Sequence, residues 1–231
     1  MKKNNLILGT FLAITAILFS SYGASPSSDS TSTEKVEGST ESTESGGVVT
    51  IGTQVWTSTN LDVSTFRNGD PIPQAKTDAE WKGAGENKQP AWCYYYNDPS
   101  NGTKYGKLYN WYAVNDPRGL APKGYHIPTD AEWTKLSDYL GGSGAGTKMK
   151  STSGWKNDGN GNNSSGFSGL PGGSRSSNGT FNNVGSYGYW WSSTENTTTS
   201  AWCRNLYYFD GGVSRDSYYK QYGVSVRCLR D

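Results

Sequence analysis

The sequence predicts an α+β domain built from short elements. Three observations favour this class. The chain holds 30 Gly in 231 residues, and Gly and Asn are poor helix formers, which excludes a long helical bundle. It also holds 9 Trp, 16 Tyr and 6 Phe, and these can build a core because each aromatic ring removes about 150–250 Å² from water. Finally, helical spacing comes early and short strand-like runs come late, the order expected of an α+β fold.

Two helices are the best supported. One covers residues 129–140, where the capping box Thr-Asp-Ala-Glu is followed by apolar residues at helical spacing and then by Gly141. The other covers residues 105–114, with one apolar side and an end at 115–117, Asn-Asp-Pro. The string Thr-Asp-Ala-Glu-Trp recurs at 77–81 and indicates a further short helix. After Gly141 no helix is expected.

Strands are expected where β-branched and aromatic residues gather between turn residues. An opening hairpin or bent strand is predicted around Gly52. The segments that fit this pattern are 48–51, 54–56, 91–96, 189–193, 201–209 and 224–229.

The N-terminal part of the chain is typical of an exported protein. Residues 1–24 combine a basic start, an apolar run and small residues, the plan of a secretory signal peptide. The apolar run is too short to span a bilayer, so no transmembrane span is expected in the mature chain. Leu-Phe-Ser-Ser at 18–21, followed by Gly23, resembles the end of a bacterial lipoprotein signal, in which position 22 would be the lipidated cysteine. Tyr22 stands there instead, so a lipid anchor at this position is excluded. The expected location is the bacterial cell surface, the periplasm or the medium.

Residues 25–47 form a Ser/Thr-rich linker. Of the 21 residues from 25 to 45, 12 are Ser or Thr and five are acidic. This composition leaves too few apolar groups to offset the entropy cost of ordering the segment. We interpret this stretch as a disordered spacer, and the alternative is a leader with no role. No second linker follows, so residues 48–231 are predicted to be a single domain.

Charge and motif content exclude several function classes. The chain has 21 basic and 20 acidic residues, so it lacks the basic surface of a nucleic-acid partner. The only histidine, His126, argues against a His-rich metal site, and we expect it to be a hydrogen-bonded structural residue. Asp158, Asn160 and Asn162 alternate and can offer oxygen ligands to calcium, although a polar turn is the favoured interpretation. No catalytic triad or phosphate-binding loop is found, so no enzyme activity is expected.

The C-terminal segment predicts a binding face. Along a strand at 202–209, alternation sends Trp202, Arg204, Leu206 and Tyr208 to one side and Cys203, Asn205, Tyr207 and Phe209 to the other. If the first set packs, the second faces outward. Exposed Tyr, Ser, Asn and Asp are the residue types of antibody loops. The candidate ligand-binding residues are Asn205, Tyr207, Phe209, Asp210, Ser214, Asp216, Ser217, Tyr218 and Tyr219. The alternative is an aromatic-rich, solvated sheet edge.

Five motifs in order resemble one family. They are Tyr-Gly-Lys-Leu-Tyr-Asn-Trp at 105–111, Gly-Tyr-His-Ile-Pro-Thr-Asp-Ala-Glu-Trp at 124–133, the Gly-rich stretch 166–173, Trp-Trp-Ser-Ser-Thr-Glu at 190–195 and Val-Arg-Cys-Leu-Arg-Asp at 226–231. From about residue 50 to the end, the chain resembles the Fibrobacter succinogenes major paralogous domain. That family is similar to the formylglycine-generating branch of the C-type lectin fold. The resemblance therefore implies a C-type-lectin-like domain with two short helices, a small twisted antiparallel sheet and extensive loops.

The segment after Ala201 also resembles family members that are targets of diversity-generating retroelements. These elements mutate adenines in the codons of variable positions, and the reachable residues exclude Trp, Met, Lys, Gln and Glu. The positions between the scaffold-like residues all hold reachable types: Cys203, Asn205, Tyr207, Phe209, Asp210, Gly211, Gly212, Ser214, Asp216, Ser217, Tyr218 and Tyr219. The resemblance thus implies a diversified segment and an unknown protein or glycan ligand.

Three cysteines in an exported chain permit one disulfide. The family motifs favour Cys93–Cys228, and Cys203–Cys228 is the alternative. The formylglycine-generating relatives use reactive cysteines, but no matching arrangement occurs here. An enzyme descended from that branch and a purely structural surface protein remain the alternatives to a ligand-binding domain.

Overall fold

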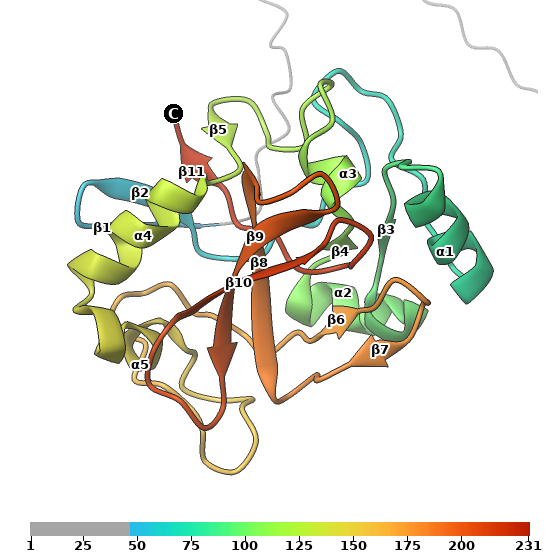
Figure 1. Cartoon of the computed structure of the whole chain (residues 1–231). Coiled ribbons are helices and arrows are strands. Elements are labelled where there is room, and N and C mark those ends of the chain that lie inside the picture. The colour runs from blue at the N-terminus through green and yellow to red at the C-terminus, as the bar shows by residue number, and fades with distance from the viewer. Residues whose placement is uncertain (1–46) are drawn as a thin grey trace, which may run out of the picture. The chain divides into compact units, whose positions relative to one another are not determined.

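The computed structural model describes residues 47–231 (Figure 1). The predicted signal peptide and all but the last residue of the predicted linker lie outside the described residues. The α+β class is confirmed. The helices are α1 Asp78–Glu86, α2 Pro99–Tyr105, α3 Trp111–Val114, α4 Asp130–Tyr139 and α5 Ala145–Met149, with 3₁₀ turns at Tyr95–Asn97 and Gly142–Gly144. The strands are β1 Val48–Ile51, β2 Gln54–Thr57, β3 Trp92–Cys93, β4 Leu108–Tyr109, β5 Tyr125–His126, β6 Ser174–Arg175, β7 Phe181–Asn182, β8 Tyr187–Glu195, β9 Ser200–Tyr207, β10 Ser214–Tyr219 and β11 Leu229–Arg230.

The described strands form four small antiparallel sheets instead of the single one expected. A four-stranded sheet has the order β1-β2-β11-β5, and a three-stranded sheet has the order β10-β9-β8. Two-stranded sheets join β3 to β4 and β6 to β7. The three-stranded sheet lies in the middle of the domain in Figure 1. It contains the longest strands, and it carries most of the predicted binding residues.

The helices agree with the sequence where a capping box is present. In α4, Thr129 accepts from the backbone N–H of Glu132 while the Glu132 side chain accepts from the Thr129 N–H, as predicted. Thr77 and Glu80 do the same for α1. Local hydrogen bonds define both helix starts, so these starts depend little on the rest of the fold.

The predicted helix at 105–114 is wrong in its first half. Gly106 ends α2 with φ +71°, and β4 then pairs with β3. Only α3 is helical, beginning after Asn110, whose side chain caps it by accepting from the Ala113 N–H. The apolar side that suggested a long helix instead reflects a buried strand followed by one helical turn.

Two further expectations after Gly141 are corrected. The short helix α5 follows it, where no helix was expected. The predicted strand at 224–229 is regular only in β11, and its earlier part forms isolated bridges, Tyr109↔Val224 and Trp190↔Ser225. This segment therefore runs between separate sheets and ties them together.

Side chains on the two faces of the three-stranded sheet belong to two different core clusters. Trp191 and Cys203 belong to one buried cluster, whereas Trp190 and Leu206 belong to another. The first cluster also includes the C-terminal residues Val224, Val226 and Cys228. Both faces of β9 are consequently packed over part of its length.

His126 joins the C-terminus to α4. Its Nδ1 lies 2.8 Å from Asp231 Oδ1 and its Nε2 lies 2.9 Å from Glu132 Oε1, which confirms a structural, hydrogen-bonded histidine. Partial burial lowers the pKa of His126, but the hydrogen bonds to the two carboxylates outweigh this effect, so the pKa is raised above its usual value.

We expect this bridge to make stability depend on pH. Because the pKa of His126 is higher in the folded chain, its contribution is complete below the unfolded pKa of about 6.5 and is lost as pH rises through the folded value. The groups are partly exposed, so screening limits the effect to about 1 kcal/mol or less. Urea unfolding between pH 5 and 9 measures this pH dependence, and His126→Gln should remove the part of it that His126 contributes. A wild-type profile unchanged by the substitution would contradict the assignment.

Candidate ligand-binding face

The alternation predicted for β9 is present, but its outward side is partly covered. Register places Trp191 and Asp216 beside Cys203, and Tyr189 and Ser214 beside Asn205. Cys203 and Asn205 were expected to face outward, and both are fully buried. Cys203 packs in one core cluster with the C-terminal residues Val224 and Val226. The Asn205 side chain instead makes hydrogen bonds with Asp216 and Tyr218 on the neighbouring strand. Local alternation reveals neither contact.

Beyond Cys203, this face carries a group of side chains that we call the tyrosine cluster. Its members come from three strands and the turn after β9: Tyr187, Tyr189, Asn205, Tyr207, Phe209, Asp216 and Tyr218. Tyr187 meets Tyr207 edge to face at 4.7 Å between ring centroids, and Tyr189 meets Tyr218 at 5.7 Å. Tyr207 and Phe209 are parallel at 5.5 Å. Such ring pairs contribute about 0.5–1.5 kcal/mol beyond their burial, so the cluster holds its own shape.

Polar groups connect the centre of the tyrosine cluster. Asn205 Nδ2 donates to Asp216 Oδ2 at 2.7 Å and lies 3.1 Å from the Tyr207 hydroxyl and 3.2 Å from that of Tyr218. The Tyr207 hydroxyl donates to the same Asp216 oxygen at 3.0 Å. The Cys203 thiol lies 3.3 Å from Asn205 Oδ1. Asn205 is therefore a buried organiser of the cluster and does not itself reach the surface.

The tyrosine hydroxyls stay neutral across the physiological range. Burial is the main cause that raises the pKa of Tyr189, Tyr207 and Tyr218 above the usual value, with nearby acidic groups adding to it. Neutral hydroxyls can both donate and accept. The cluster thus presents aromatic rings together with hydroxyls and one carboxylate.

The other predicted binding residues are dispersed. Ser217 and Tyr219 alternate to the opposite face of β10, where both are exposed. Asp210 is exposed in the turn after β9, and its Oδ1 accepts from the Gly212 N–H at 2.9 Å. Ser214 lies opposite Asn205, near the turn that connects β9 to β10. The nine predicted residues therefore do not form one face.

Sequence reasoning missed the contribution of β8. Tyr187 and Tyr189 complete the tyrosine cluster, and Asn183 Nδ2 donates to the Tyr189 hydroxyl at 2.9 Å. Tyr222 extends the row of rings, 5.7 Å from Tyr218. The alternation of Tyr187, Tyr189 and Trp191 was a visible signal, but pairing it with β9 requires the sheet register.

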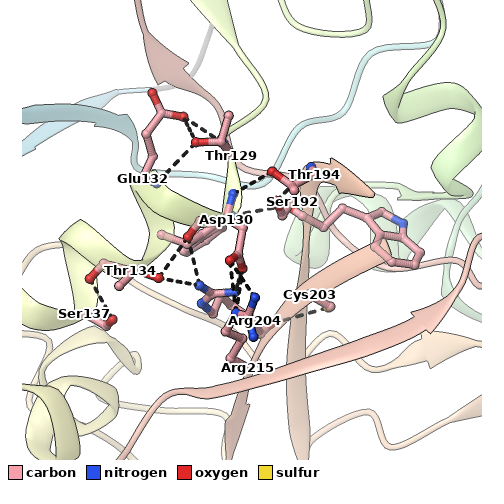
Figure 2. A network of polar contacts seen from close by, with 12 residues as sticks. Thr129, Asp130, Glu132, Thr134, Ser137, Ser192, Thr194, Cys203, Arg204 and Arg215 are labelled. Atoms are coloured by element: carbon pink, nitrogen blue, oxygen red, sulfur yellow. Dashed lines mark hydrogen bonds and ion pairs between the residues drawn. The ribbon is translucent and has the colours of Figure 1, made fainter. Parts of the chain in front are cut away.

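The opposite face of the sheet is a scaffold. Figure 2 shows Arg204 and Arg215 both directed toward the carboxylate of Asp130, at the start of α4. Arg204 Nη1 lies 2.6 Å from Asp130 Oδ1, and Arg215 donates to both carboxylate oxygens at 2.9–3.0 Å. The Arg215 guanidinium also lies 3.3 Å from the centre of the Trp202 ring. Partial burial raises the pKa of Asp130, but the two arginines outweigh it and the pKa is lowered. Every charge here is paired, so this network joins α4 to β9 and β10.

The predicted Cys93–Cys228 disulfide is not formed. Residues 47–231 include all three cysteines and contain no disulfide. Cys93 belongs to a different core cluster from Cys203 and Cys228, which explains why the favoured pair does not meet. Burial raises the pKa of Cys93 to about 12 and raises that of Cys203 further.

The loop considered for calcium already uses its amide oxygens internally. Asn160 Oδ1 accepts from the Trp155 N–H and Asn162 Oδ1 from the Ser164 N–H, both at 3.0 Å. Over residues 47–231, no group of three His, Cys, Asp or Glu side chains is arranged to hold a metal ion. In the same range no helix reaches the length and apolarity needed to cross a bilayer.

Leu206 and Tyr219 give a test of the division between scaffold and surface. Leu206 is 1% exposed and Tyr219 is 60% exposed. We expect Leu206→Ala to lower the free energy of unfolding by about 2–5 kcal/mol and Tyr219→Ala to change it by about 0.5 kcal/mol or less. Urea denaturation measures both. Equal losses would show that the two positions are not divided in this way.

Tyr218, unlike Tyr219, contributes to the packing of the sheet. It is half-buried against Tyr189 and lies within hydrogen-bond distance of Asn205. We therefore expect Tyr218→Ala, unlike Tyr219→Ala, to cause a measurable loss of stability.

The comparison with known families agrees with the motifs. Residues 49–230 match the family model described as the Fibrobacter succinogenes major domain. No curated protein and no solved structure matches the chain. The matched range spans nearly all of the described residues, from β1 to β11. The chain therefore belongs to the Fibrobacter succinogenes major domain family.

Proposed function

We propose that this chain is an exported, non-enzymatic recognition domain that binds a protein or glycan ligand through the tyrosine cluster. The observation that carries the proposal is the contrast between the two faces of the three-stranded sheet. One face pairs its charges with α4. The other gathers rings and hydroxyls around Asp216, and Phe209 at its edge is 66% exposed. Rigid Tyr and Phe rings offer large contact area at a low entropic cost.

A C-type-lectin-like scaffold is part of this proposal. The two longest described helices, α1 and α4, the small antiparallel sheets and the long irregular segment between α5 and β6 are in keeping with it. Export is supported by the sequence of residues 1–24. The competing enzymatic role would draw on reactive cysteines, and the raised pKa values of Cys93 and Cys203 speak against thiolate chemistry at these residues.

Diversification of the β9–β10 hairpin also belongs to the proposal. Tyr207, Phe209 and Asp216 are residue types that adenine mutation can produce, and all three lie in the tyrosine cluster. Arg204 and Arg215, on the opposite face, bind Asp130 of the scaffold. The expected genomic finding is a nearby reverse-transcriptase gene with a template repeat that differs from the gene only at template adenines. Differences at arbitrary bases would leave a recognition domain of fixed specificity.

The binding role is tested by comparing two equally exposed aromatic residues. Phe209, in the tyrosine cluster, and Tyr139, outside it on α4, are both 66% exposed. The chain is applied to arrays of glycans and bacterial or host surface proteins, and each array ligand is then titrated. Phe209→Ala should weaken binding about tenfold or more, as expected of a hot-spot aromatic, whereas Tyr139→Ala should not. Equal effects, or no ligand on either array, would contradict the proposal and favour a structural surface protein.

A further inference from the structure

The charge balance of the tyrosine cluster distinguishes it from an ordinary aromatic surface. Asp216 is its one carboxylate and is partly buried. The basic residues on the neighbouring strands are engaged elsewhere, Arg204 and Arg215 with Asp130 and Lys220 with Glu195. Within residues 47–231 no cation forms an ion pair with Asp216. Its negative charge is therefore not compensated by this part of the chain.

The hydrogen bonds leave half of this carboxylate available. Asn205 and Tyr207 both donate to Oδ2 of Asp216. No described residue donates to Oδ1. The two donors fix the orientation of the carboxylate, and the open oxygen remains an acceptor without a partner.

The rings around Asp216 add to the negative potential. Tyr207 is joined to Asp216 through its hydroxyl, and Tyr187 and Phe209 adjoin the Tyr207 ring, with Phe209 parallel to it and Tyr187 at 69°. Ring faces carry negative electrostatic potential and attract ammonium and guanidinium groups, more strongly when water is excluded. Several aromatic rings combined with an unpaired carboxylate form a recognised environment for an organic cation.

We infer that the tyrosine cluster binds a basic group, the lysine or arginine side chain of a protein ligand. This inference rests on the proposed function and specifies the ligand chemistry of the same site. The cation would meet the open oxygen of Asp216 and those ring surfaces of the tyrosine cluster that are not stacked on one another. An uncharged glycan would use the rings and hydroxyls but would leave the carboxylate without a counter-ion.

The inference is tested with small probes on the full chain. Nα-acetyl-lysine methylamide carries the cation, and Nα-acetyl-norleucine methylamide has a comparable aliphatic side chain without the ammonium group. Each is titrated while the tyrosine ring signals are followed by NMR. We expect the lysine probe to bind at least tenfold more tightly than the norleucine probe, and to weaken as salt is added.

Asp216→Asn isolates the charge. An Asn oxygen at position 216 can still accept from Asn205 and Tyr207, so the fold and the rings are preserved. This variant should lose most of the tenfold preference. The matched control is Asp138→Asn, which makes the same change of net charge at an exposed position of α4 outside the cluster; it should keep the preference.

The outcomes separate this inference from the proposed function. Equal binding of the two probes, no binding of the lysine probe, or a preference that survives Asp216→Asn would overturn the cationic ligand. In each of those cases the array experiment with Phe209→Ala still decides whether the cluster binds a ligand. Array ligands confined to uncharged glycans would likewise overturn the inference while supporting the recognition role.

Discussion

Replacement of Arg227 by Met is expected to lower the free energy of unfolding by about 3 kcal/mol. Arg227 is 1% exposed and donates to the carbonyls of Thr57 and Phe167 at 2.7–2.8 Å and to Asn60 Oδ1 at 2.7 Å. Each buried acceptor that loses its donor costs about 1–3 kcal/mol. Removal of a desolvated charge offsets part of this loss, and burial has already lowered the pKa of Arg227 to about 9. The guanidinium also lies 4.5 Å from the centre of the Phe167 ring, and Met removes this contact together with the hydrogen bonds.

Urea unfolding followed by tryptophan fluorescence measures this effect. The matched control is Arg230→Met, because Arg230 is exposed and its one hydrogen bond, to the Tyr125 hydroxyl, is long at 3.3 Å. The control should change stability by about 0.5 kcal/mol or less. If Arg227→Met were as stable as the wild type, the buried guanidinium would contribute no net stability and the C-terminal segment would be held by apolar packing alone.

The second large effect is expected at Trp191. This residue is fully buried in the core cluster beneath the tyrosine cluster, and its Nε1–H donates to the Tyr109 carbonyl at 2.9 Å. Trp191→Ala creates a large cavity and removes this hydrogen bond, so we expect a loss of about 3–5 kcal/mol. The Tyr109 carbonyl keeps a second donor, the Val224 N–H at 3.2 Å. Because Tyr189 and Cys203 pack in the same cluster, the substitution should also perturb the NMR signals of the tyrosine cluster.

Trp202→Ala is the matched control for this experiment. Trp202 lies on the neighbouring strand, is partly exposed and stacks on Arg215. Loss of that contact should cost about 1 kcal/mol, measured by the same unfolding assay. A loss at Trp202 as large as that at Trp191 would show that the scaffold face carries as much of the stability as the buried core does.

Part of the candidate site could be predicted from the sequence, because it depends on residues that are close together in the chain. The alternation of β9 follows from strand geometry, and it correctly separates Arg204 and Leu206 from Asn205 and Tyr207. The aromatic and polar composition of the segment was equally visible. The burial of Asn205 was not visible, because it depends on contacts with Asp216 and Tyr218 on the neighbouring strand.

The sequence by itself determined the α+β class, the starts of α1 and α4, the positions of strands β1 and β2 and the family, because caps, alternation and motifs act between residues close in the chain. Only the tertiary structure decided which side chains meet. The register of β8 against β9 brings Tyr187 beside Tyr207, and the basic side chains that turn toward Asp130 and Glu195 leave Asp216 without an ion-pair partner within residues 47–231. Such contacts join distant segments, and their geometry is set by the packing of the whole domain.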